Sequence, residues 1–228
     1  MALGFISGVL FVDEAYQLNP KTNPMGGQIL DYLLPEMENR RSTLVVVIAG
    51  YSKPMEDLIA FNEGLPSRFP ERLVFDDYTE KELLQILMDL VGAERWKLAD
   101  EKHARIAARR LARQSGTTGF GNARAVRNLL DLTKKRQAAR VLDEREQGRA
   151  PDVFLIERSD LLGPKGLDVS KCDALSKLNG MRGLHKVKQA VEQLIKLVEM
   201  NSELEEMEKM VRDVNLNKIF LGNPGTGT

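Results

Sequence analysis

The stretch Gly8-Val9-Leu10-Phe11-Val12-Asp13-Glu14 decides the fold of the first part of the sequence. A continuous apolar run of this length is typical of a strand that is buried on both faces of a parallel sheet. We expect Asp13 and Glu14 at the carboxyl end of that strand, where α/β sheets bind their ligands. There, one carboxylate can hold Mg²⁺ through water and the next can polarise an attacking water. A solvated strand end is the alternative.

The pattern downstream of this strand is that of an α/β layer. Apolar residues at helical spacing predict a helix over residues 27–38. The β-branched run at 44–49 predicts a second buried strand, and a shorter strand is expected at 73–75. Strands and helices that alternate in this way indicate a parallel sheet.

A helical subdomain is expected after this layer. Thr79 and Glu82 have the spacing of a capping box, so a helix should begin after Thr79. Further helices should begin near Asp100 and Asn122, and the Gly- and Pro-containing stretch 147–151 should end the last one. The pattern therefore predicts three helices in succession.

The last part of the sequence has the pattern of a new unit. Apolar residues between 184 and 198 predict a strongly amphipathic helix. Beyond them, Glu205 with Lys209 and Glu208 with Arg212 have the i,i+4 spacing of helical ion pairs.

A strand expected at 218–221 leads into the glycine-rich end Gly222-Asn223-Pro224-Gly225-Thr226-Gly227-Thr228. Gly222 and Gly227 have the spacing of a phosphate-binding loop, whose backbone N–H groups surround phosphate oxygens. The lysine of that motif is absent, because Thr228 stands in its place. We interpret this end as a P-loop remnant; a Gly/Pro turn after an edge strand is the alternative.

Four further side chains have both a functional and a structural interpretation. Arg68 and Arg72 precede the expected third strand, where an arginine can reach a phosphate in a neighbouring subunit; exposed surface arginines are the alternative. Tyr51 follows the second strand and either senses the γ-phosphate or simply packs. Arg124 opens the helix near Asn122, where it either contacts phosphate from a lid or is solvated while Asn122 caps the helix.

A basic helix face is formed by Arg105, Arg109, Arg110 and Arg113. Such a face could touch nucleic acid, but the chain has 33 basic and 33 acidic residues. Because the net charge is zero, a solvated face is favoured over a nucleic-acid interface. The two histidines are isolated from cysteines and from carboxylate clusters, so no metal site made of protein ligands alone is expected.

Composition restricts the class of protein. Of the 228 residues, 43% are hydrophobic and 29% charged, which is the mix of a globular protein. No apolar run approaches the roughly 20 residues that span a bilayer, and the stretch Met1 to Val12 lacks the basic start of a signal peptide. The single cysteine, Cys172, forms no intrachain disulfide and favours a reducing, cytoplasmic compartment.

The order of these motifs resembles one subfamily of AAA+ ATPases, the red-type rubisco activases and stage V sporulation protein K–like ATPases. Four stretches carry the resemblance: GVLFVDEAYQL at 8–18, LVVVIAGY at 44–51, FNEGLPSRFPERLVFDDYT at 61–79 and GFGNARAVRNLLDLTKKRQAAR at 119–140. The resemblance covers about residues 8–163. Residues 174–228 resemble the beginning of another AAA+ module.

The resemblance implies ATP and Mg²⁺ as cofactors. Asp13 matches the Walker B carboxylate that holds Mg²⁺ through water, and Glu14 matches the carboxylate that activates the attacking water. Tyr51 falls at the sensor 1 position, where many AAA+ proteins have Asn or another small polar residue. Arg68 matches the arginine finger, and Arg72 is the second choice for it.

The helical and C-terminal motifs complete the match. Arg124 corresponds to sensor 2 in the helical lid, and the glycines at 222–227 correspond to Walker A without its lysine. In the family, Walker A precedes Walker B within one module, whereas here Walker B comes first. The resemblance therefore implies a fragment of a tandem AAA+ protein. Its parts would be a partial α/β subdomain at 1–78, a helical lid at 79–163, a linker at 164–173 and the start of a second module at 174–228.

Family members assemble into rings, which would be hexameric in the parent protein, and they use ATP hydrolysis to remodel client proteins. Because its Walker A is incomplete, the isolated chain is expected to hydrolyse ATP negligibly. The alternative function is a non-hydrolysing adaptor that docks on an intact AAA+ ring. A permuted module, in which the C-terminal strand folds back onto the first sheet, is a third hypothesis, and nucleic-acid binding is the fourth.

Overall fold

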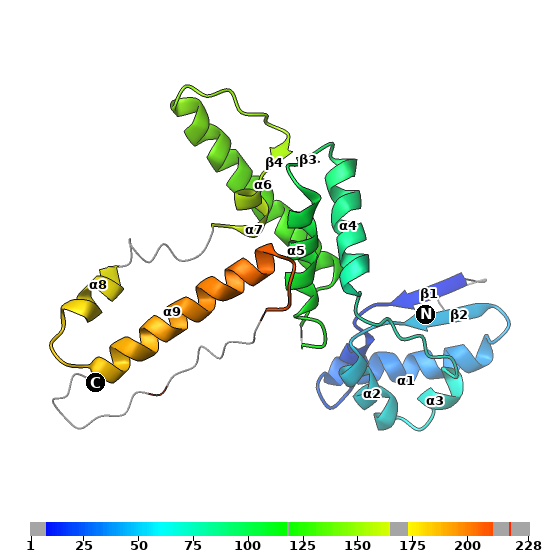
Figure 1. Cartoon of the computed structure of the whole chain (residues 1–228). Helices are drawn as coiled ribbons and strands as arrows, with labels where there is room; N and C mark the ends of the chain where they lie inside the picture. Colours follow the sequence, from blue (N-terminus) through cyan, green and yellow to red (C-terminus); the bar gives the residue numbers. More distant parts are fainter. Residues whose placement is uncertain (1–7, 118, 165–172, 212–218, 220–228) are drawn as a thin grey trace. The chain divides into compact units, whose positions relative to one another are not determined.

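The computed structural model describes residues 8–117, 119–164, 173–211 and 219 (Figure 1). The chain divides into two compact units: unit 1 is residues 1–75 and unit 2 is residues 76–228. The predicted P-loop remnant at 222–228 lies outside the described residues, as does the predicted linker at 164–173 except for its two end residues.

Unit 1 contains a parallel pair of strands with helices beside it. Its described elements are β1 (Gly8–Val12), the 3₁₀ helix η1 (Ala15–Leu18), α1 (Pro24–Asn39), β2 (Leu44–Ile48), α2 (Ser52–Phe61) and α3 (Leu65–Arg68). The strands pair in register from Gly8 opposite Leu44 to Val12 opposite Ile48. The first two predicted strands and their parallel pairing are confirmed.

The start of α1 depends on a proline and a glycine. The helix begins three residues before the predicted start, because Pro24 suits its first turn, where a missing N–H costs nothing. Gly26 lies against η1, and a Cβ at this position would stand 2.0 Å from the carbonyl oxygen of Gln17. Only a residue without a side chain permits this close approach.

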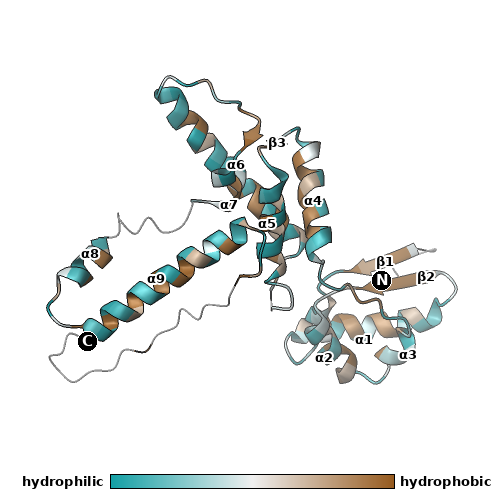
Figure 2. Ribbon diagram, in the orientation of Figure 1, coloured by the Kyte–Doolittle hydropathy of each residue, from teal (hydrophilic) through white to brown (hydrophobic). Residues whose placement is uncertain are grey.

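The core of unit 1 lies among its helices and not across its sheet. Its buried side chains are Ala15, Leu18, Leu30, Leu58 and Leu65. The expectation of strands buried on both faces is wrong for these residues: the side chains of Val9 and Phe11 are 71% and 61% exposed. In β2, Leu44, Val46 and Ile48 are half-buried while Val45 and Val47 are exposed, so helices cover only one face. Figure 2 shows both strands as strongly apolar ribbons.

The predicted third strand at 73–75 is wrong. These residues form no strand, and Leu73, Val74 and Phe75 are 85%, 75% and 94% exposed. An apolar, β-branched tripeptide has the local propensity for a strand, but it forms one only when a neighbouring strand supplies hydrogen bonds. The described part of unit 1 pairs no strand with it.

Unit 2 is mainly helical. Its described elements are α4 (Glu80–Ala93), β3 (Lys97–Leu98), α5 (Glu101–Ala112), α6 (Ala123–Glu146), β4 (Leu155–Ile156), α7 (Arg158–Leu162), α8 (Asp173–Gly180) and α9 (His185–Glu206). The predicted capping box is confirmed, because the Thr79 hydroxyl accepts from the Glu82 amide and the Glu82 carboxylate accepts from the Thr79 amide. The predicted helices beginning near Asp100 and Asn122 are confirmed as α5 and α6.

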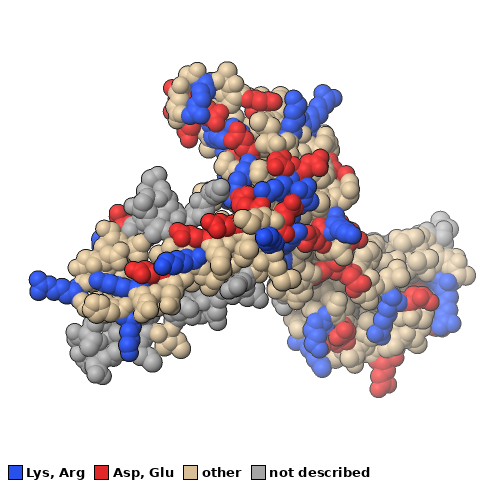
Figure 3. Space-filling view, in the orientation of Figure 1, with Lys and Arg blue, Asp and Glu red and all other residues tan. Residues whose placement is uncertain are grey.

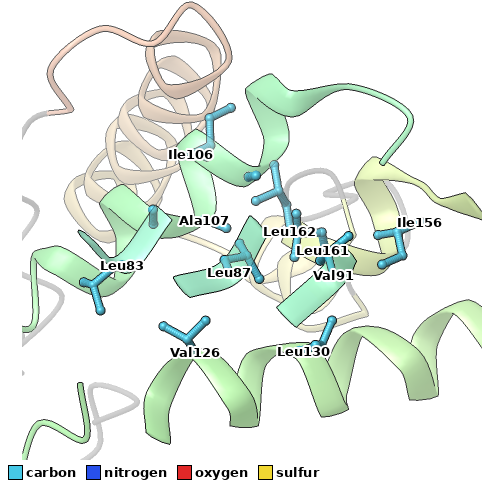
Figure 4. Close-up of a cluster of buried hydrophobic side chains, with 12 residues drawn as sticks. Leu83, Leu87, Val91, Ile106, Ala107, Val126, Leu130, Ile156, Leu161 and Leu162 are labelled. Carbon is cyan, nitrogen blue, oxygen red and sulfur yellow. The ribbon is translucent and has the colours of Figure 1, made fainter. Parts of the chain in front are cut away.

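The core of unit 2 is formed where α4, α5, α6 and α7 meet (Figure 4). Leu83 and Leu87 of α4, Val126 of α6 and Leu161 of α7 are no more than 1% exposed. The short strands β3 and β4 pair in parallel, and Ile156 of β4 belongs to this cluster. Beside them the Trp96 ring packs against Phe154, with ring centroids 5.9 Å apart.

A buried ion pair ties α7 and β4 to α6. The Arg140 Nε lies 3.1 Å from both carboxylate oxygens of Asp160, and Arg140 Nη2 also donates to the Leu155 carbonyl at 2.9 Å. Asp160 is 1% exposed, and its carboxylate also accepts from the Glu157 amide. The hydrogen bonds with Asp160 raise the pKa of the Arg140 guanidinium.

The helix α9 begins after Leu184, which caps it in a left-handed conformation. Its predicted amphipathic character is visible in Figure 2 as alternating apolar and polar turns. The predicted i,i+4 pair of Glu205 with Lys209 is not found among the described residues, because α9 ends at Glu206 and the helix does not reach Lys209. The second predicted pair includes Arg212, which lies outside the described residues. None of the described helices is both long enough and apolar enough to cross a membrane.

We expect Arg140→Met to lower the free energy of unfolding of unit 2 by about 3 kcal/mol, because it leaves the buried Asp160 carboxylate without its cation. Urea denaturation followed by circular dichroism measures the loss. Arg145→Met removes an exposed arginine from the same helix and should change the free energy by less than about 0.5 kcal/mol. Equal effects of the two substitutions would contradict the role of the buried pair.

Candidate functional site

The carboxyl ends of β1 and β2 meet at one edge of the sheet. The Ala49 amide donates to the Val12 carbonyl at 2.9 Å, and the Ala15 amide donates to the Ala49 carbonyl at 2.8 Å. These two hydrogen bonds hold the two segments together just beyond the ends of the strands. Asp13 and Glu14 therefore lie beside the segment that leads from Ala49 to Tyr51.

The two carboxylates differ in their surroundings. Asp13 is exposed, and its Oδ1 accepts a hydrogen bond from the Glu14 amide at 2.9 Å. Glu14 is half-buried, and its backbone is left-handed, with φ 52° and ψ 38°. A left-handed residue other than glycine costs roughly 1–2 kcal/mol. The Glu14 carboxylate accepts a hydrogen bond from the hydroxyl of Tyr16.

Tyr16 connects Glu14 to Tyr51. The rings of Tyr16 and Tyr51 pack with centroids 6.1 Å apart and planes tilted by 35°. Gly50 makes room for this contact, because a Cβ there would stand 3.0 Å from Tyr16 Cδ1 and from Met55 Sδ. The sequence predicted Asp13, Glu14 and Tyr51 but missed Tyr16. The only local signal was its position two residues after Glu14.

Arg68 and Arg72 lie elsewhere in unit 1. Arg68 ends α3, its Nη1 donates to the Gly64 carbonyl at 3.1 Å, and its Nη2 lies 3.7 Å from the Glu38 carboxylate of α1. Its Nε is buried and has no hydrogen-bond partner among the described residues. Arg72 is exposed in the segment after α3. Neither arginine has a described contact with Asp13 or Glu14.

Arg124 is exposed on the first turn of α6, in unit 2. The residue before that helix, Asn122, does not cap it with its side chain. Instead its Nδ2 donates to Asp77 Oδ1 at 2.6 Å and its Oδ1 accepts from the Tyr78 amide at 2.8 Å. The alternative in which Asn122 caps the helix is therefore wrong. Its side chain is bound instead by Asp77, 45 residues away in the sequence, and this contact also fixes the start of α6.

Asp77 also fixes the loop that precedes α6. Its Oδ2 accepts from the Gly116 amide at 2.8 Å and from the Ser115 hydroxyl at 3.1 Å. The hydrogen bond from Asn122 has the largest effect in lowering the pKa of the Asp77 carboxyl, and the hydrogen bonds from Gly116 and Ser115 lower it further. The segment entering α4 and the loop entering α6 are thus joined through one carboxylate.

The basic face of α5 is not simply solvated. Arg105 pairs with Glu208, Arg110 and Arg113 pair with Glu205, and Arg109 pairs with Glu80. The expectation of a solvated face holds only in part: the arginine side chains remain partly exposed, but carboxylates distant in the sequence pair with them. No cluster of three or more His, Cys, Asp or Glu able to hold a metal occurs among the described residues.

The sheet edge fits a magnesium ion that is bound mainly through water. Mg²⁺ usually keeps several waters and takes one or two carboxylates together with substrate phosphates. Asp13 is exposed at the position where an α/β sheet places such a carboxylate. Glu14 stands next to it with a carboxylate already held by a hydroxyl donor.

Comparison with known proteins connects both units to one family. Residues 79–167 match the AAA lid domain family. The chain is 38% identical over 160 residues to a CfxQ homolog of Trieres chinensis and 39% identical over 165 residues to the plasmid-encoded CbxX of Cupriavidus necator. The chain belongs to the CfxQ/CbxX-like group of AAA+ proteins. The resemblance seen in the sequence is confirmed.

The matches cover most of this AAA+ chain but only part of each relative. The two alignments take in 69% and 70% of this chain and 55% and 51% of the relatives. The ESX-1 secretion system protein EccA1 of Mycobacterium leprae is 40% identical over 185 residues, which are 76% of this chain and 31% of EccA1. The chain thus spans about half the length of its CfxQ and CbxX relatives.

We expect Glu14→Gly to be about 1 kcal/mol more stable than Glu14→Ala, because glycine alone adopts the left-handed backbone without strain. Both substitutions remove the Tyr16 hydrogen bond equally, so their difference isolates the backbone term. Hydrogen exchange of the β2 amides reports the stability of unit 1. Equal stability of the two variants would show that residue 14 carries no strain.

We expect the hydrogen bonds around Asp77 to be lost on acidification. Because its pKa is lowered below 3.8 in the folded chain, the stabilisation is complete above that value and disappears as the pH falls through the lower, folded pKa. The NMR shift of the Gly116 amide should therefore titrate with a midpoint below pH 3.8. In Asp77→Asn this titration should vanish; its persistence would assign it to another carboxyl.

Proposed function

We propose that this chain is part of an ATP-dependent AAA+ remodelling ATPase, in which Asp13 and Glu14 are the Walker B pair. The observation that carries the proposal is the sheet edge, where both carboxylates lie beside Tyr51 in a chain that also contains an AAA lid. The names and the sequences of the relatives support the family, and the geometry of unit 1 supports the assignment of the pair.

The residues at the sheet edge would have different roles in ATP hydrolysis. Mg²⁺ bound with ATP supplies the positive charge that stabilises phosphoryl transfer. Asp13, exposed and acidic, would hold that ion through water. Glu14 would orient and polarise the attacking water. Its hydrogen bond from the Tyr16 hydroxyl restrains its carboxylate, so Tyr16 would position Glu14 and Tyr51 would serve as sensor 1.

The arginines would act from other surfaces. Arg68 is the proposed arginine finger, with Arg72 as the second choice, and it would act on a neighbouring subunit. This role agrees with its lack of described contacts to Asp13 and Glu14. Arg124 is the proposed sensor 2, held at the start of α6 through Asn122 and Asp77.

The rest of the proposal concerns the parent protein. AAA+ proteins generally form ring oligomers, and we propose a hexameric ring that works on a client protein in the cytoplasm. The glycine-rich end at 222–228 would be the start of Walker A in a second module that begins near residue 174. The isolated chain, without a complete Walker A, would not turn over ATP.

Turnover measured in the full-length protein that contains this sequence tests the proposal. We expect Glu14→Gln to reduce the ATPase rate at least a hundredfold while fluorescent ATP still binds, because the amide cannot polarise water. Glu71→Gln makes the same change at an exposed residue of unit 1 and should leave turnover within twofold of the original protein.

Unchanged turnover in Glu14→Gln would overturn the Walker B assignment. Arg68→Ala should abolish turnover, and mixing it with Glu14→Gln should restore part of it, because a finger acts across subunits. The adaptor alternative makes a different prediction: the chain would bind tightly to an intact AAA+ ring, and Glu14→Gln would not affect the activity of a complex containing it.

A further inference from the structure

Two glutamates at the C-terminal end of α9 and a third just beyond the helix meet the lid of unit 2. We call Glu205, Glu206 and Glu208 the acidic end. The basic residues opposite them form the basic stripe, which consists of Lys102, Arg105, Arg109, Arg110, Arg113 and Arg158. Figure 1 shows the end of α9 beside α5, and Figure 3 shows acidic and basic side chains intermingled on this part of the surface.

Two arginines of α5 bind the acidic end in the paired geometry that guanidinium and carboxylate groups favour. Arg105 places Nε 2.6 Å and Nη2 3.0 Å from the two oxygens of Glu208. Arg110 places Nε 3.0 Å and Nη2 2.6 Å from the two oxygens of Glu205. Two parallel hydrogen bonds fix orientation as well as distance, so this contact is directional.

The third glutamate links two lid helices. Glu206 is paired with Arg158 of α7, and its carboxylate lies 3.5 Å from Lys102 Nζ of α5. Arg109 adds a hydrogen bond from Nη1 to the Glu208 backbone carbonyl at 3.0 Å. Arg105 and Glu208 are 103 positions apart in the sequence, and Arg110 and Glu205 are 95 apart, so no local turn brings these partners together.

The acidic end would be unfavourable without the basic stripe. The C-terminus of a helix carries partial negative charge, and glutamates there oppose it. Glu205 and Glu206 occupy the last two positions of α9. The arginines neutralise both the carboxylates and the helix terminus, which gives a physical reason for the position of these glutamates.

The contact is ionic and not apolar. No residue of α9 is buried. The side chains of Arg105 and Arg110 remain 41% and 40% exposed, whereas Glu205 is 12% exposed. Ion pairs that solvent reaches are weakened by salt, so this contact can open without the exposure of a buried apolar core.

We propose that the basic stripe of the lid is a docking surface for the acidic end of α9 in the same chain, forming a reversible, salt-sensitive clasp between the lid and the segment that follows it. The inference rests on contacts within unit 2 and does not require the proposed ATPase function. A movement of the lid would then be transmitted to α9 while the clasp is closed and not while it is open.

Spin-label distances in the full chain test the clasp. With Cys172→Ser, labels at Lys135→Cys on α6 and Lys196→Cys on α9 occupy exposed positions outside the contact. We expect one narrow distance distribution in 50 mM NaCl and a broad one in 1 M NaCl. A narrow distribution at both salt concentrations would overturn the proposal.

Matched neutralisations of the same helix supply the control. Replacing Glu205, Glu206 and Glu208 by Gln should broaden the distribution in 50 mM NaCl, as should Arg105→Gln with Arg110→Gln on the lid side. Replacing the exposed Glu192, Glu199 and Glu203 by Gln makes the same charge change on α9 and should leave the distribution narrow. Broadening in the control triple, or none in either clasp variant, would overturn the clasp.

Dilution of the doubly labelled chain with a tenfold excess of unlabelled chain distinguishes docking of the acidic end within one chain from docking on a second copy. An unchanged distance supports docking within one chain. Loss of the distance on dilution would show that α9 docks on a second copy and would overturn the intrachain proposal. Circular dichroism of each variant confirms that α9 remains helical, so that broadening reports release and not unfolding.

Discussion

The Ala49 amide donates to the Val12 carbonyl, and the Ala15 amide donates to the Ala49 carbonyl. These hydrogen bonds hold the ends of β1 and β2 together after the strands themselves have ended. The position of Asp13, the left-handed turn at Glu14 and the packing of Tyr16 on Tyr51 all depend on them. A shift of one residue in the strand register would turn each of these side chains to the other side of the edge.

Unit 2 is stabilised by contacts of a different kind. Its apolar core supplies most of the burial, but polar contacts fix how its helices begin and end. The Thr79 capping box starts α4, Asp77 joins that start to the loop before α6, and Asp160 pins α7 to Arg140. Because these contacts link neighbouring helix ends, they fix the position of the first turn of α6, which carries Arg124.

The sequence predicted those features whose causes are local. A run of β-branched residues, a capping box and a helical apolar pattern each lie within a few residues, and β2, α4 and α6 formed where they indicated. The sequence failed where the cause is distant. Residues 73–75 have strand propensity but no neighbouring strand, the partners of Arg105 and Arg110 come from about a hundred residues away, and nothing local marks Tyr16 as the partner of Glu14.

The ring pair of Trp96 and Phe154 gives the chain an internal optical label. The sequence has one tryptophan, and it lies beside the short strands of the lid, so its emission reports unit 2 alone. Three of the four tyrosines, Tyr16, Tyr32 and Tyr51, belong to unit 1. Excitation at a wavelength that only tryptophan absorbs therefore follows the lid without any introduced dye. A tyrosine signal that changes at a different denaturant concentration would show that the two units unfold independently.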